Sequence, residues 1–306
     1  MIKIVFFGTN HFAATILEGL LSSPLVSVNL VITQPDKPVG RKQEMRKSAV
    51  KIMAEEKNLL ISQPSTLKNY KLEIDSAQIG LVAQYGQIIP ENILASFPYG
   101  AINVHPSLLP KYRGAAPIQT AILNGQTETA ITLMKVDQGL DTGPILLQKI
   151  CQIGQNEMYI QIEKKLAELA IAALFQAIPD YLDGKLLPVA QNEKHATLTR
   201  QLTRSDGRID WHKTAADIYN QYRALSPWPG VWTSWNRKRL KFLQILPSEK
   251  SSLPGLVSFS VSDGSVYIGC AKGSIQVIEL QIEGKKASSI KTFLNGHKTI
   301  LHASLI

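Results

Sequence analysis

Three polar residues near the middle of the chain have the types needed for attack on a carbonyl group. Asn103 and His105 lie two residues apart at the end of an apolar run, so both side chains fall on one face of a strand. Asp141 follows in a turn rich in Gly and Asp. An Asn amide can donate to a developing oxyanion, a His can transfer protons, and an Asp can orient and support an imidazolium. We interpret the three as a catalytic set; alternatively, they only end a strand and hold a turn.

Such a set needs a sheet that gathers its strand ends at one edge. Apolar runs alternate with stretches of helical spacing, a pattern typical of α/β proteins with a doubly wound, mostly parallel sheet. Ligands of such sheets bind outside the carboxyl ends of the strands. We expect strands at 2–7, 26–33, 80–85, 101–104, 129–136 and 145–153, and helices at 12–21, 49–57, 115–123 and 158–182.

The last hundred residues change character. After an expected helix at 215–224, short alternating runs are separated by Gly, Ser and Asp, at 231–235, 240–245, 255–260, 265–268 and 274–280. Five short strands of this kind predict a C-terminal OB-like β-barrel. We therefore expect a catalytic domain at 1–189, a linker at 190–206 and a barrel at 207–306.

Composition narrows the class of protein. With 306 residues, 44% hydrophobic and 19% charged, the chain fits a globular protein and not a disordered one. Cys151 and Cys270 lie far apart, which indicates a reducing compartment. The sequence has no long apolar run and no signal-peptide core, so we expect a cytoplasmic protein without a membrane segment. Its His and Cys residues do not cluster with metal-ligand spacing, so we expect no metal.

Positive charge is concentrated in two places. Of the formal net charge of +9, residues 207–306 carry +7, and residues 37–51 hold six basic residues against one Glu. Clustered Lys and Arg attract phosphates, so these charges indicate a polyanionic partner such as a nucleic acid. Charge that serves only solubility is the alternative.

The stretch Asn103-Val-His-Pro-Ser-Leu-Leu-Pro-Lys-Tyr-Arg-Gly-Ala-Ala-Pro117 resembles the motif of enzymes that take a formyl group from 10-formyltetrahydrofolate. Over nearly its full length the chain resembles the methionyl-tRNA formyltransferase family. The resemblance implies catalytic roles for Asn103, His105 and Asp141, a folate donor and no metal. It also implies folate contacts at Ser107, Leu108, Leu109, Pro110, Gln84, Tyr85, Gly86, Ile88 and Pro90.

The same resemblance implies an acceptor, the α-amino group of methionyl-initiator-tRNA. The segment Thr33–Arg41 is similar to a basic loop that contacts tRNA in this family, which implies tRNA contacts at Arg41, Lys42, Arg46 and Lys47. The basic residues of the barrel that we expect to hold phosphates are Arg237, Lys238, Arg239 and Lys241. We expect a monomer. The sequence departs from the family pattern at Asn10, where Pro is usual, and across 46–51, where a Pro-x-Pro-Val-Lys pattern is usual.

Other functions share some of these motifs. Sugar-nucleotide N-formyltransferases have the Asn-x-His and Ser-Leu-Leu-Pro motifs, and also resemble the chain at Asp210-Trp-His and Pro227-Trp-Pro. Three segments favour tRNA by resemblance, at 33–41, 139–144 and 284–288. A non-catalytic RNA-binding module would not need all three polar residues. Hydrolysis of the formyl donor would use the same site but would not need the basic barrel.

Overall fold

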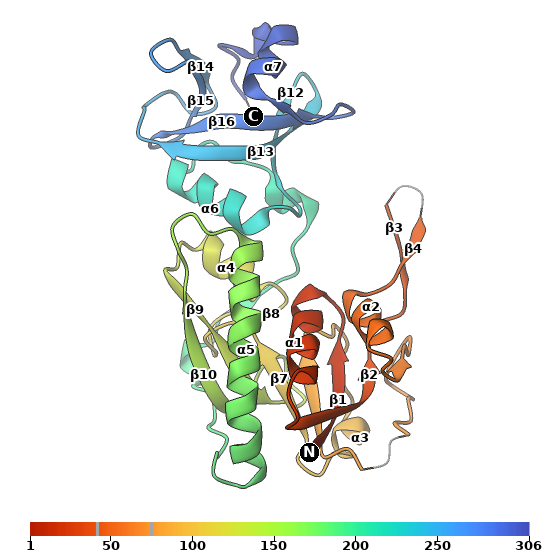
Figure 1. Ribbon diagram of the computed structural model, residues 1–306. Helices are drawn as coiled ribbons and strands as arrows, with labels where there is room; N and C mark the ends of the chain where they lie inside the picture. The colour runs from red at the N-terminus through yellow and green to blue at the C-terminus, as the bar shows by residue number, and fades with distance from the viewer. Residues whose placement is uncertain (41–42, 74–75, 306) are drawn as a thin grey trace. The chain divides into compact units, whose positions relative to one another are not determined.

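The computed structural model describes residues 1–40, 43–73 and 76–305 (Figure 1). These residues divide into two compact units, and neither unit is one continuous stretch of chain. The first unit takes most of the chain up to Thr199. The second takes the chain from Arg200 onward together with two earlier segments, Ile118–Thr127 and Ile153–Tyr159.

A mostly parallel sheet forms the centre of the first unit, as predicted. In the described residues it has seven strands, in the order β10-β9-β7-β6-β1-β2-β5. In this spatial order, all neighbouring pairs from β7 through β6, β1 and β2 to β5 are parallel. Strand β9 runs antiparallel to both β7 and β10. Their bounds are Ile2–Gly8 (β1), Val26–Ile32 (β2), Ile61–Ser62 (β5), Ile79–Ala83 (β6), Ala101–His105 (β7), Glu128–Lys135 (β9) and Ile145–Gln152 (β10).

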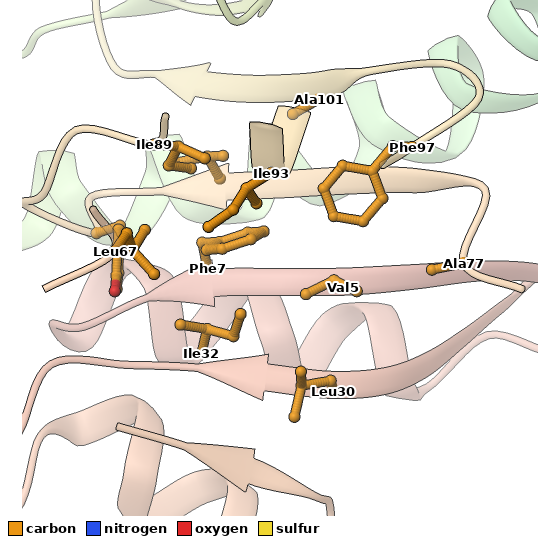
Figure 2. Packing of buried hydrophobic residues seen from close by; sticks show 12 residues of the cluster. Val5, Phe7, Leu30, Ile32, Leu67, Ala77, Ile89, Ile93, Phe97 and Ala101 are labelled. Carbon is orange, nitrogen blue, oxygen red and sulfur yellow. The ribbon is translucent and has the colours of Figure 1, made fainter. Parts of the chain in front are cut away.

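Buried apolar runs explain the central strands. Residues Ile4–Phe7 of β1 are all 0% exposed, because the strand is covered on both faces. Phe7 meets the rings of Tyr85 and Phe97 edge-on, at centroid distances of 5.7 and 6.3 Å. Figure 2 shows Phe7, Ile93 and Phe97 within one apolar cluster on this face of the sheet. The cluster fixes the strands whose ends carry the predicted site.

Three helices of the first unit lie where the spacing predicts helices, and a fourth, the short helix Glu91–Leu94, is not among the predicted ones. They are α1 (His11–Leu21), α2 (Ala49–Glu56), α3 (Glu91–Leu94) and α5 (Tyr159–Leu182). Asn10 caps α1, since its side chain accepts from the backbone N–H of Ala13 at 3.2 Å. Helices α1 and α5 lie side by side (Figure 1), and a Cβ at Gly19 of α1 would collide with Ile171 of α5. No described helix has both the length and the hydropathy needed to traverse a bilayer.

The order of the strands reverses between β1 and β6. From β1 the chain passes through α1 to β2 on one side, and later returns to β6 on the other side. In open α/β sheets ligands bind where this reversal occurs, outside the carboxyl ends of the strands. Because β1, β6 and β7 are parallel neighbours, the loops that follow them open at the same edge. Asn103 and His105 therefore lie beside the reversal.

A short hairpin occupies the basic segment. Its strands are β3 (Lys37–Val39) and β4 (Glu44–Arg46), and it extends beyond α2 (Figure 1). Asp36 lies at the base of this hairpin, and its carboxylate accepts hydrogen bonds from Gln63 Nε2 at 2.9 Å and Lys51 Nζ at 2.8 Å. These two hydrogen bonds lower the pKa of Asp36. Ser48, in the segment that departs from the family pattern, caps α2 through Lys51 N at 3.0 Å. The departure from the family's sequence pattern therefore does not disturb the capping of α2.

An antiparallel β domain makes up most of the second unit, as predicted. Among the described residues its main ladder runs in the order β12-β13-β16-β15-β14, and β17 pairs with β16. The pairing of β13 with β16 has register shifts between Phe242 and Ile245, the kind of irregularity that bends strands at the rims of small barrels. The strands are Val231–Trp235 (β12), Lys238–Ser248 (β13), Val257–Ser260 (β14), Ser265–Gly269 (β15), Ser274–Ile282 (β16) and Ser288–Ser289 (β17).

Helices α4 (Pro117–Leu123), α6 (Ala215–Leu225) and α7 (Ile290–Gly296) accompany this ladder. The second of the two earlier segments is bound to the rest of the unit by a buried side chain. Arg223 of α6 is 4% exposed and donates from Nη1 to the carbonyl oxygens of Gly154 and Glu157, at 3.1 and 2.9 Å. Burial lowers the pKa of this guanidinium.

Candidate active site

The structure brings Asn103, His105 and Asp141 together. Asn103 and His105 stand on β7, and Asp141 lies in the loop between β9 and β10. Asn103 Nδ2 donates to Asp141 Oδ1 at 3.2 Å, and His105 Nδ1 lies 3.5 Å from Asp141 Oδ2. The sequence predicts this grouping from the spacing of two residues on a strand and from the turn, rich in Gly and Asp, that holds Asp141. The structure places the three side chains in the predicted proximity.

Backbone groups on the segment after β7 complete the contacts of the three side chains. Gly114 N donates to Asp141 Oδ2 at 2.8 Å. His105 Nε2 lies 3.0 Å from the carbonyl oxygen of Tyr112, and because a carbonyl only accepts, Nε2 is the donor. His105 is 4% exposed, with acceptors at both ring nitrogens.

A cavity of about 630 Å³ opens beside these side chains. Its size falls within the range of small-molecule sites in proteins, about 300–1,000 Å³. It is lined by the loops that follow β1, β6, β7 and β9, so it lies at the reversal of strand order. The lining includes Asn10, Gln84–Ile89, Pro106 and Val136–Asp141 from these loops, and Asn103–His105 from β7 itself.

Four of the predicted folate residues line this cavity, namely Gln84, Tyr85, Gly86 and Ile88. The ring of Tyr85 turns into the core, where burial raises the pKa of its hydroxyl to about 12. The carbonyl oxygen of Tyr85 accepts from Thr9 Oγ1 and from Gln34 Nε2, both at 2.8 Å. This loop is therefore held by its backbone. Pro90 instead precedes α3 as its N-cap.

In the part of the chain that the structure describes, the other predicted folate residues do not line the cavity. Ser107 is 0% exposed; its hydroxyl donates to the carbonyl oxygen of Lys111 at 2.6 Å, and its own carbonyl accepts from Thr132 Oγ1 at 2.6 Å. Leu109 is also buried, and Pro110 follows it through a cis peptide bond. Folate contacts by the segment 107–110, Leu108 included, stay a prediction.

Several contacts at this site were not foreseen from the sequence. Asn10 Nδ2 donates to Gln84 Oε1, so the residue that departs from the family pattern joins the cavity wall. Behind Asp141, Arg113 is 4% exposed and its hydrogen bonds to Glu193 raise the pKa of Arg113 and lower that of Glu193. Gln191 joins the same group. Both Gln191 and Glu193 fall in the segment expected to be a linker.

The predicted tRNA contacts lie partly outside the described residues, because Arg41 and Lys42 are not described. Arg46 is exposed on β4, and Lys47 Nζ lies 2.7 Å from Glu55 Oε2. In the second unit Arg237 and Lys238 are exposed. Their neighbours on β13 are partly engaged: Arg239 lies 4.3 Å from the centroid of the Trp232 ring, and Lys241 Nζ lies 3.4 Å from the carbonyl oxygen of Pro227. Roles in tRNA binding stay predictions.

Metal chemistry has no evident ligand set in the part of the chain that the structure describes. There, no three His, Cys, Asp or Glu side chains come close enough together to hold an ion. The cavity itself presents the hydrogen-bonding and proton-transfer groups of Asn103, His105 and Asp141.

Comparisons with known proteins find related sequences along nearly the whole chain. Residues 2–178 match the family described as "Formyl transferase", and residues 201–298 match "Formyl transferase, C-terminal domain". A protein of Caldicellulosiruptor saccharolyticus named methionyl-tRNA formyltransferase is 40% identical over 303 residues, covering 96% of this chain and 97% of that protein. One of the same name from Streptococcus uberis is 37% identical over 301 residues, covering 97% and 96%.

Among solved structures, the N-formyltransferase from Helicobacter canadensis, in complex with folinic acid and dTDP-3-aminofucose, has a TM-score of 0.66. It is 23% identical to this chain and covers 90% of it and 99% of its own length. At this identity the likeness shows a shared fold alone.

Proposed function

Because the chain belongs to the family of methionyl-tRNA formyltransferases, we propose that it moves a formyl group from 10-formyltetrahydrofolate to the α-amino group of methionyl-initiator-tRNA. The observation that carries the proposal is an identity of 40% that extends through both units. The cavity beside Asn103, His105 and Asp141 supplies a site of fitting chemistry. Sugar-nucleotide acceptors rest on structures of 23% identity, which bear on the fold and not on the acceptor.

In the proposed reaction the α-amino nitrogen attacks the formyl carbon and forms a tetrahedral intermediate. The bond from that carbon to the folate nitrogen then breaks, and the proton lost by the amine passes to that nitrogen. Asn103 gives one amide hydrogen to Asp141, which leaves its other amide hydrogen for the oxyanion. The folate pocket would include the cavity wall at Gln84 and Ile88.

His105 supports the proton transfer in this proposal. Its Nε2 is engaged by the carbonyl of Tyr112 at 3.0 Å. Its Nδ1 lies 3.5 Å from Asp141, which is long for a hydrogen bond, so Nδ1 is the less tightly engaged nitrogen and the one that we assign to the reacting atoms. Asp141 keeps the ring oriented and compensates its positive charge.

The basic residues extend the proposal to the tRNA. Arg237 and Lys238 of the second unit, with Arg46 on the hairpin, would contact phosphates. Such contacts fix position and add affinity, and they weaken with salt. We expect a monomeric cytoplasmic enzyme, and size-exclusion chromatography of the purified protein tests the monomer.

The decisive experiment is a formylation assay with 10-formyltetrahydrofolate and either methionyl-initiator-tRNA or an amino-sugar nucleotide. We expect formyl-methionyl-tRNA and no formylated sugar. Formylation of the sugar alone would refute the acceptor. Release of formate without a formylated acceptor would indicate a hydrolase, and tRNA binding without turnover would indicate a binding module.

A further inference from the structure

Gln191 lies directly behind the loop that carries Asp141. Its Nε2 donates to the carbonyl oxygen of Asp141 at 2.9 Å and to that of Gly143 at 2.7 Å. Asp141 has a φ of +54°, a left-handed conformation that residues other than Gly adopt rarely. Such a conformation persists where the surroundings hold it, and Gln191 supplies two of the holding contacts.

The orientation of the Gln191 amide is fixed by Arg113. Arg113 donates from Nε and Nη2 to Gln191 Oε1, at 3.1 and 2.8 Å. A guanidinium only donates, so the amide oxygen must face Arg113 and the NH₂ group must face the Asp141 loop. Arg113 is in turn held by both oxygens of Glu193, at 2.8 and 2.7 Å.

The residues on each side of Arg113 touch the catalytic side chains. Gly114 donates to the carboxylate of Asp141, and Tyr112 accepts from His105. Arg113 therefore connects Gln191 to the same backbone segment that aligns Asp141 and His105. The backbone N–H of Gly114 therefore binds the carboxylate of Asp141, while the side-chain amide of Gln191 binds its backbone carbonyl.

We propose that Gln191 is a positioning residue for formyl transfer, because it holds Asp141 in the conformation that meets Asn103 and His105. This inference rests on the proposed function and deepens it. Misplacement of a reacting group by about 1 Å can cost about a hundredfold in rate, so the loss of both contacts should reduce kcat.

Gln191→Glu is the sharpest test. The change keeps the size of the side chain and an oxygen for Arg113, but it replaces both donors with an oxygen that faces two carbonyls. We expect kcat for methionyl-tRNA to fall by about tenfold or more, while KM for the tRNA and Kd for the folate stay within about threefold. Gln201→Glu makes the same change of charge on an exposed side chain and should leave kcat unchanged.

A second measurement separates positioning from a general structural role. If Gln191 acts through Asp141, Gln191→Glu should cost less than about threefold in kcat when Asp141 is already Asn, because the effects of two residues that act as a unit do not multiply. A cost that multiplies in the double variant would overturn the proposal. If Gln191→Glu does not fold, Gln191→Ala removes the same donors and carries the same expectations.

The outcomes distinguish this inference from the proposed function. A wild-type protein that does not formylate methionyl-tRNA would refute the proposed function. A wild-type protein that does so, with Gln191→Glu at full kcat, would overturn only the role of Gln191.

Discussion

Replacing Asp141 by Asn removes one charge and one acceptor while it keeps the size of the side chain. In the structure, Oδ1 accepts from Asn103 and Oδ2 accepts from Gly114, close to His105. An Asn side chain offers one oxygen and one NH₂ group. Whichever way the amide turns, its NH₂ group faces a donor, either the amide of Asn103 or the N–H of Gly114.

The size of the effect follows from these contacts. A hydrogen bond to a charged group contributes about 1.5–3 kcal/mol, and at least one such bond is lost. In the proposed mechanism the loss is felt in the transition state, where Asp141 would no longer support proton transfer by His105. About 2.7 kcal/mol corresponds to about a hundredfold in rate, so we expect Asp141→Asn to lower kcat by about that factor.

Single-turnover formylation with saturating donor and methionyl-tRNA measures this change directly. Folate affinity should stay near that of the wild type, because the carboxylate is directed at protein donors. Asp183→Asn is the matched control, since Asp183 is exposed beside Lys185 and should leave kcat unchanged. A folded Asp141→Asn protein with kcat within about threefold of the wild type would refute the assigned role.

Three further predictions concern stability and reactivity. Phe7→Ala empties a fully buried position and should lower the free energy of unfolding by about 3–5 kcal/mol in urea titrations; a change below about 1 kcal/mol would contradict the packing. Burial raises the pKa of Cys270 to about 11, so alkylation at pH 8 should be slow until denaturant is added, and rapid labelling of the folded protein would contradict its burial. Hydrogen bonds from Arg200 and Thr203 lower the pKa of Asp206, so the contribution of this carboxylate to stability is present above pH of about 4 and lost in more acidic solution. Asp206→Asn should therefore be less stable than the wild type by about 1 kcal/mol at pH 7. Equal stability of the two proteins at pH 7 would count against these contacts.

Local patterns predicted the regular strands because those patterns report burial. Val231–Trp235 alternates buried with more exposed residues, and the strand has the predicted bounds. Because Pro, Gly and Lys residues are not typical of strands, the sequence predicts a loop in the basic segment, whereas the structure has paired strands at Lys37–Val39 and Glu44–Arg46. The pairing of Leu198–Thr199 with Arg113–Gly114 joins residues 85 positions apart, and no local pattern indicates such a contact.

The residues of the site also divide into those that local sequence patterns predict and those that they do not. Asn103 and His105 could be predicted from a spacing of two on a strand, and Asp141 from the turn that follows the next strand. Gln191 stands in a polar segment without periodicity, and its importance comes from two carbonyls that it meets only in the folded chain. The buried position of Ser107 was also not evident, because its motif resembles a ligand contact.

The interleaving of the two units constrains the order of folding during synthesis. Residues Ile118–Thr127 and Ile153–Tyr159 emerge from the ribosome well before Arg223, which fastens the second of these segments. Chains fold from the N-terminal end as they are made. Ile118 and Ile122, both buried in the finished protein, belong to a unit most of which is translated after them. A nascent chain that ends near Thr199 would carry all seven described strands of the sheet, while the carbonyl groups of Gly154 and Glu157 still lack the guanidinium that binds them in the finished protein. A partly assembled second unit of this kind is an intermediate on which chaperones act.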